Sequence, residues 1–275
     1  MNTLKRDKQL AVISALVEGS SVRSIERMTG VHRDTILRLM NRVGEGCQRL
    51  LDSRMKNLSC RFVQVDEIWT FVQKKQKYVR PWDSLDAGDQ YVFVGLDADT
   101  KLVPAFRVGR RDGPTADAFI RDLSGRLARR VQLTTDGFRP YIMAVEGAFG
   151  ANVDYAQLVK MYTSDPQTDG ARYSPPRIKS ITASFISGNP WPERISTSFV
   201  ERSNLTMRMQ MRRFTRLTNA FSKRLVNLRS AVALHFAHYN FVRVHLTLKV
   251  APAVAAGLET YTWNLGQLLD AALAA

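Results

Sequence analysis

Cysteine and histidine are scarce in this chain, which has two cysteines and four histidines among 275 residues. Cys47 and Cys60 are too few for a disulfide framework or a four-cysteine zinc site, and we expect two reduced thiols, with a single disulfide bridge as the alternative. The N-terminus has no signal-peptide core, and charged or polar residues interrupt the apolar stretches. These absences exclude a disulfide-stabilised secreted scaffold and a membrane-spanning protein, and they predict a cytoplasmic one.

Acidic residues are also in deficit, because 25 aspartates and glutamates stand against 40 lysines and arginines, for a formal net charge of +15. Hydrophobic residues make up 45% of the chain, which predicts a packed core rather than disorder. Such a positive folded protein is expected to bind a polyanion. An anionic membrane surface is the alternative, but no separate lysine-rich amphipathic helix supports it.

Residues 5–43 have the apolar spacing of three short helices. The first is expected to stop at Gly19, and Ser21 is a suitable N-cap for a second helix at 22–28. A tight turn at Thr29-Gly30-Val31 leads into the third helix, which has Ile36 on its apolar face. A helix, a short turn with glycine and a second helix are typical of a helix-turn-helix.

The polar face of that third helix carries Arg33, Arg38 and Arg42. Arginines on such a face can donate hydrogen bonds to base edges and phosphates, so we expect these three to bind DNA. A three-helix packing unit with a solvated basic face is the alternative. We predict a helix-turn-helix DNA-binding domain at residues 1–50, followed by a linker at 51–60.

The pattern then changes to that of a mixed α/β domain, predicted at 61–235. Strands are expected at 62–72, 91–96, 102–108, 131–135 and 153–162, with helices at 115–130 and 141–149. Three antiparallel strands followed by helix, strand, helix and strand predict a ribonuclease H-like mixed sheet with flanking helices. Residues 165–191 read as a long loop, and 236–275 as a C-terminal helical tail.

Residues 197–213 fit two structures. Leu205, Met207, Met209 and Met211 alternate as in a strand, but the segment is rich in helix formers and poor in β-branched residues. We predict a helix, on which Glu201 and Arg208 share one face. A longer helix is expected to follow, with apolar positions from Leu217 to Phe236.

Three carboxylates are candidates for a shared metal site: Asp66 inside an apolar strand, Asp136 at the end of another, and Glu201. A carboxylate in an apolar strand is costly to desolvate unless it is paired or binds a metal, and ion pairing of Asp66 remains the alternative. Magnesium prefers a few oxygen ligands, and two such ions can drive phosphodiester cleavage. Glu67 is expected to point to the opposite face of the sheet from Asp66.

Several stretches resemble bacterial insertion-sequence transposases with a DDE catalytic triad, most closely those of insertion sequence one and its relatives. They are Val65-Asp66-Glu67-Ile68-Trp69, Thr134-Thr135-Asp136-Gly137, Ser198-Phe199-Val200-Glu201-Arg202-Ser203-Asn204, and His238-Tyr239-Asn240-Phe241 with Ala251-Pro252-Ala253. The resemblance covers roughly residues 60–265 and is specific as a set. Many relatives carry an N-terminal cysteine-rich zinc element that has no counterpart here, so zinc is not carried over.

The resemblance implies a DNA transposase that binds element ends, cleaves phosphodiester bonds and transfers the 3′ end to target DNA. Asp66, Asp136 and Glu201 would be the catalytic residues and the ligands of two Mg²⁺ or Mn²⁺ ions, and Arg208 would contact DNA near the cleaved phosphate. The implied partner is double-stranded DNA, on which the chain would form a homo-oligomer at the bacterial nucleoid.

Ten cations and no acid lie between residues 202 and 249. We expect part of this segment to follow the phosphates of DNA, through Arg208, Arg212, Arg213 and Arg216, although a solvated helix face is the alternative. Two other functions remain open. One is a metal-dependent nuclease of the same fold without strand transfer, and the other is a domesticated or inactive DNA-binding regulator.

Overall fold

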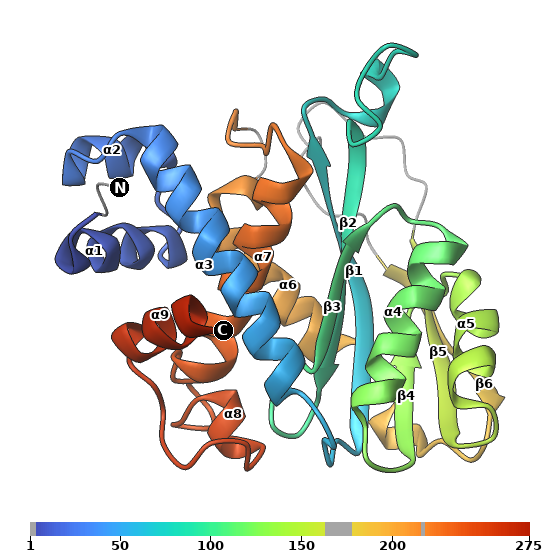
Figure 1. Ribbon diagram of the computed structural model, residues 1–275. Coiled ribbons are helices and arrows are strands. Elements are labelled where there is room, and N and C mark those ends of the chain that lie inside the picture. The colour runs from blue at the N-terminus through green and yellow to red at the C-terminus, as the bar shows by residue number, and fades with distance from the viewer. Residues whose placement is uncertain (1–3, 163–177, 216–217) are drawn as a thin grey trace.

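The computed structural model describes residues 4–162, 178–215 and 218–275 (Figure 1). Its centre is a six-stranded mixed sheet of order β3-β2-β1-β4-β5-β6. The strands are β1 (Phe62–Val72), β2 (Gly88–Asp97), β3 (Ala105–Gly109), β4 (Val131–Thr135), β5 (Val153–Tyr162) and β6 (Ile178–Ser187). The first three strands form an antiparallel meander, β4 lies parallel to β1, and β5 lies parallel to β4. This is the ribonuclease H-like arrangement that the sequence predicts.

Helices cover both faces of the sheet. They are α1 (Arg6–Val17), α2 (Val22–Thr29), α3 (Arg33–Arg54), α4 (Gly113–Arg126), α5 (Pro140–Phe149), α6 (Ser198–Gln210), α7 (Leu225–Phe241), α8 (Pro252–Ala255) and α9 (Leu265–Ala274). On one face, Phe93 of β2 packs against Phe119 of α4 and Tyr141 of α5. On the other, Phe106 of β3 packs against Phe236 of α7, and α6 lies along β1.

The N-terminal helices follow the predicted order but not the predicted boundary. Ser21 caps α2 by accepting a hydrogen bond from the backbone N–H of Ser24, and Gly30 ends it with a φ of 69°. Helix α3 is longer than expected and runs through the boundary at residue 50 into the predicted linker. Its second half has a buried face that includes Cys47 and Leu51, because it packs between α7 and α9 (Figure 1). Helices α1, α2 and α3 therefore share one core with the C-terminal helices.

Three other expectations need correction. The predicted loop at 165–191 contains strand β6, which pairs antiparallel with β5; residues 163–177 lie outside the described residues. Helix α7 begins at Leu225, and Leu217, the expected start of its apolar face, is also outside them. The predicted boundary between residues 235 and 236 falls inside α7. Within the described ranges, no helix has the length and apolar composition needed to cross a membrane.

Two glycines allow α3 to approach its neighbours closely. A Cβ atom on Gly46 would lie 1.7 Å from the carbonyl oxygen of Ala272 in α9, and one on Gly44 would lie 2.3 Å from that of Ser230 in α7. Both contacts are with backbone, which a side-chain rotation cannot relieve. The close packing of α3 therefore depends on these two positions lacking a side chain.

Gly46→Ala is expected to lower the free energy of unfolding by about 1–3 kcal/mol, because α3 and α9 would have to separate. Gly125→Ala, in α4, is the matched control, since a Cβ atom there would meet nothing within 4 Å. It should leave stability unchanged or raise it by up to about 1 kcal/mol through helix propensity. Urea denaturation of both variants measures the difference, and equal midpoints would contradict the packing argument.

Candidate active site

Strand register brings Asp66 and Asp136 together across a gap of 70 residues. In the parallel pairing of β1 with β4, Val65 lies opposite Thr135. The next residue of each strand is an aspartate, so Asp66 and Asp136 emerge side by side where β4 ends. Carboxylate oxygens of the two side chains lie within 4.8 Å of each other. The structure thus unites two of the three acids that the sequence selects.

Helix α6 brings the third acid, Glu201, to the same place. The segment is helical from Ser198 to Gln210, as predicted, despite the alternating methionines. Gln64, two residues before Asp66, accepts hydrogen bonds from the backbone N–H groups of Phe199 and Val200 at 2.9 and 3.1 Å. These are free N–H groups of the first turn, so Gln64 attaches the start of α6 to β1.

Glu201 lies at the rim of this site. Asp66, Asp136 and Glu201 all line one pocket of about 790 Å³, together with Arg111 and Lys160. The Glu201 side chain is 43% exposed and forms an ion pair with Lys160 of β5. It also accepts a hydrogen bond of 2.6 Å from the hydroxyl of Thr197. Glu201 therefore shares the pocket but does not belong to the tight carboxylate cluster.

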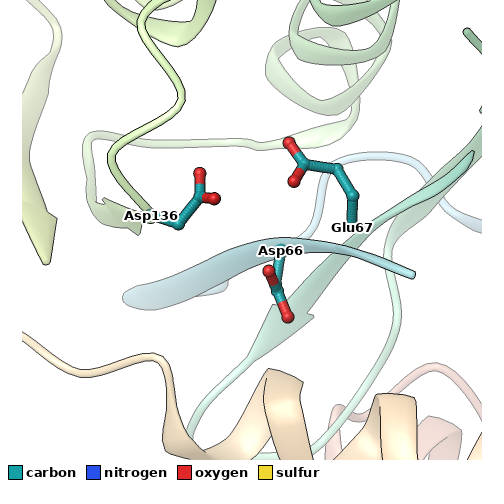
Figure 2. Close-up of side chains that lie close together, drawn as sticks. All are labelled: Asp66, Glu67 and Asp136. Carbon is teal, nitrogen blue, oxygen red and sulfur yellow. The ribbon is translucent and has the colours of Figure 1, made fainter. Parts of the chain in front are cut away.

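The third member of that cluster is Glu67, which sequence reasoning set aside. Asp66 and Glu67 do point to opposite faces of β1, as expected (Figure 2). Asp136, however, sits at the end of β4 and faces Glu67, and one oxygen from each of Asp66, Glu67 and Asp136 lies within 4.8 Å of the other two. The signal available in the sequence was the adjacent pair of acids in an otherwise apolar strand.

Neutral and basic side chains hold the cluster in place. The side-chain amide of Asn204, one turn after Glu201 on α6, donates to Asp66 at 2.9 Å. Arg111 donates to Asp136 at 3.1 Å and reaches Glu67 at 3.5 Å, and its guanidinium stacks 4.1 Å above the ring centroid of Phe138. The backbone N–H of Phe138 donates to Asp136 at 3.0 Å.

Burial raises the pKa values of all three carboxyl groups, and the charge of Asp136 adds to the effect on Asp66 and Glu67. Burial, followed by the charge of Asp136, raises the pKa of Asp66 to about 6, although the hydrogen bond from Asn204 acts in the opposite direction. Burial and Asp136 likewise raise the pKa of Glu67 to about 7, which Tyr141 and Arg111 partly oppose. Burial raises the pKa of Asp136 too, against Phe138 and Arg111. A positive charge placed among these acids would stabilise their ionised forms.

The cluster fits a hard divalent cation. Its ligand atoms are carboxylate oxygens, which Mg²⁺ and Mn²⁺ prefer, and it contains neither histidine nor cysteine. Among the described residues, none hydrogen-bonds to Oε1 of Glu67, a buried oxygen. An orphaned buried carboxylate oxygen is expensive, and a metal ion would satisfy it.

The predicted DNA-binding arginines differ in their surroundings. Arg33, Arg38 and Arg42 are exposed on α3, as predicted, while their neighbour Asn41 hydrogen-bonds to Asn227 of α7. Arg208 lies on α6, two turns beyond Glu201, and Arg212 is exposed. Arg216 lies outside the described residues.

Arg213 does not fit the predicted DNA-binding role. Its guanidinium donates to the hydroxyl of Ser222 at 2.8 Å and contacts the sulfur of Met40 in α3 at 3.0 Å. Burial lowers its pKa to about 10. The side chain thus links the turn that follows α6 to α3 instead of facing a phosphate, which a count of cations along the sequence could not reveal.

Arg213→Ala is expected to lower the free energy of unfolding by about 1–3 kcal/mol, because it removes packing and leaves the buried Ser222 hydroxyl without its donor. The adjacent Arg212→Ala, at an exposed position, should leave stability within about 0.5 kcal/mol of the parent. Denaturant titration compares the two. Equal losses in both variants would refute the structural role of Arg213.

No family model and no curated protein matches this chain. Similar solved structures include the piggyBac transposase synaptic complex with hairpin DNA, at 9% identity and a TM-score of 0.45 over 99% of this chain and 71% of that one. The Mos1 transposase paired-end complex with left transposon end has 16% identity and a TM-score of 0.24, over 56% of this chain and 60% of that one. The Mos1 strand transfer complex has 15% identity and a TM-score of 0.25, over 86% and 80%. Scores this low carry no argument about function.

Proposed function

We propose that this protein is a DDE-type DNA transposase of the kind found in bacterial insertion sequences. It would bind element ends, cleave phosphodiester bonds with two Mg²⁺ or Mn²⁺ ions, and transfer the 3′ end to target DNA as a homo-oligomer. The observation that carries the proposal is the convergence of Asp66, Asp136 and Glu201 from β1, β4 and α6 on one pocket of a ribonuclease H-like fold. The net charge of +15 supports a polyanionic substrate.

The carboxylates would hold the ions, which when bound activate the attacking hydroxyl and stabilise the charge on the leaving oxygen. The surrounding residues fix the ligands. Asn204 orients Asp66, Arg111 orients Asp136, and Thr197 and Lys160 orient Glu201. Gln64 keeps α6 against β1, which sets the position of Glu201 relative to the two aspartates.

The arginines would divide the binding of DNA between two parts of the chain. Arg33, Arg38 and Arg42 on α3 would read the element ends, and Arg212 and Arg216 would follow the phosphate backbone. Arg208 shares α6 with Glu201 and would act on the cleaved phosphate. Counterion release at these sites would make binding steeply dependent on salt.

A strand-transfer assay tests the proposal and separates it from its rivals. Duplexes made from the DNA that flanks the gene, labelled at one end, are incubated with the full chain, a supercoiled target plasmid and Mg²⁺ or Mn²⁺. Covalent joining of labelled DNA to the plasmid is the result expected of a transposase. Cleavage without joining would favour the nuclease, and sequence-selective binding without cleavage in either metal would favour the regulator.

A further inference from the structure

Glu67 is a buried acid whose surroundings do not neutralise it. Its side chain is 3% exposed, on the face of the sheet covered by α4 and α5. Arg111 approaches only Oε2, at 3.5 Å, and within the described residues the Oε1 atom of Glu67 has no hydrogen-bond partner of good geometry, although the hydroxyl of the fully buried Tyr141 lies close enough to lower the pKa of Glu67. A buried carboxylate oxygen without a hydrogen-bond partner costs free energy, and a bound cation would offset that cost.

The charges of the cluster indicate the valence of that cation. Asp66, Glu67 and Asp136 bring three negative charges when ionised, and Arg111, which pairs with both Glu67 and Asp136, brings one positive charge. Asp66 receives a hydrogen bond from the neutral amide of Asn204. Two negative charges are left over, which matches one divalent ion.

The spacing of the oxygens fits the same conclusion. Mg²⁺, Mn²⁺ and Ca²⁺ bind oxygens at roughly 2.0–2.6 Å, so ligands on opposite sides of one ion are separated by about 4–5 Å. One oxygen from each of Asp66, Glu67 and Asp136 lies within 4.8 Å of the other two. In Figure 2 the carboxylates of Glu67 and Asp136 face each other above β1, and the carboxylate of Asp66 lies on the other side of the strand.

We propose that Glu67 is a fourth metal-binding carboxylate, which together with Asp66 and Asp136 holds a divalent ion. This inference rests on the proposed function because it concerns the same catalytic site, but it assigns a ligand outside the triad. The proposal also predicts that Arg111 weakens metal binding. The guanidinium competes with the ion for Glu67 and Asp136.

Binding of Mn²⁺ to the full chain without DNA tests the inference, with affinity and stoichiometry measured by electron paramagnetic resonance of the free ion. Glu67→Gln keeps the shape and an acceptor for Arg111, and should weaken binding about tenfold or more, or remove one ion. Arg111→Gln breaks the same ion pair but should strengthen binding. Opposite effects from the two partners distinguish a ligand from a residue that merely positions Arg111.

Glu67→Asp separates coordination from long-range electrostatics, because it keeps the charge and shortens the side chain by one methylene. It should weaken Mn²⁺ binding nearly as much as Glu67→Gln. Parent-like affinity in either Glu67 variant, with native circular dichroism, would overturn the role of Glu67 and leave the proposed function intact. If Glu67→Gln fails to fold, Glu67→Asp and Arg111→Gln still decide the question. No Mn²⁺ binding by the parent chain would overturn the metal-dependent function itself.

Discussion

Asp136→Asn is expected to reduce the rate of metal-dependent DNA cleavage about a thousandfold or more at saturating DNA, equivalent to roughly 4 kcal/mol of transition-state stabilisation. The substitution keeps the shape of the side chain but removes the charge that would bind the metal. Asp66→Asn and Glu201→Gln should have losses of the same order, because all three side chains line one pocket. Binding of DNA should stay close to that of the parent chain, since the arginines are unchanged.

Asp117→Asn is the matched control for these variants. Asp117 is a partly exposed acid of α4 that pairs with Arg121 in the same helix, and it is not among the residues of the site. Gel assays of cleavage and fluorescence anisotropy of labelled duplexes separate catalysis from binding. A variant of Asp66, Asp136 or Glu201 that cuts at the parent rate would be removed from the catalytic set.

Most of the sheet could be predicted from the sequence, because its central strands are local runs of β-branched and aromatic residues. The bounds of β1, β4 and β5 agree with the prediction. Strand β6 could not be predicted in this way, since its burial pattern is almost entirely exposed and its structure depends on pairing with β5. The sequence of helix α6 fitted both a helix and a strand, because part of its structure also depends on a distant contact. Its first turn is bound by Gln64, a residue more than 130 positions earlier.

In the site too, the local sequence predicts some features, and others depend on contacts between distant residues. Asp66 and Asp136 could be selected because Asp66 lies within an apolar strand and Asp136 ends another, but their contact depends on the register of β1 with β4. Glu67 was not included among the candidate metal ligands, because alternation along a strand predicts which face a side chain lies on but not which residues it contacts. Asp136 leaves the end of β4 on the side of Glu67, which only the folded chain reveals.

The number of arginines in a segment does not indicate which of them are exposed. Arg212 and Arg213 are equivalent in the sequence, yet one is exposed and the other contacts Met40 and Ser222. The length of α3 was missed for a related reason, because Gly44 and Gly46 lower helix propensity locally while permitting close contact with α7 and α9. In both cases, packing against distant helices decides the role of the residue.

Asp66→Asn is expected to stabilise the fold even as it abolishes cleavage. The pKa of Asp66 rises from 3.8 to about 6 on folding, so its ionised form is less favourable in the folded chain than in the unfolded one. A shift of this size corresponds to about 3 kcal/mol, which the variant should regain at pH 8. Asparagine can still accept the hydrogen bond from Asn204, because its side-chain oxygen replaces that of the aspartate.

The pH dependence of this gain follows from the direction of the shift. Above the folded-state pKa of about 6 the parent carries the full cost of an ionised Asp66. As the pH falls through 6 toward 3.8, the folded chain takes up a proton that the unfolded chain does not, so the difference between parent and variant shrinks. Urea denaturation at several pH values between 5 and 8, with a chelator present, measures that difference.

Adding Mg²⁺ to the same experiment links stability to the site. An ion that binds the folded parent raises its free energy of unfolding by mass action, and Asp66→Asn should gain much less because it lacks a ligand charge. The advantage of the variant at pH 8 should therefore fall as Mg²⁺ increases. Two results would contradict this prediction: a variant less stable than the parent at pH 8 in chelator, or an equal increase in the free energy of unfolding of both proteins with Mg²⁺. Either would show that ionised Asp66 stabilises the fold without a bound cation.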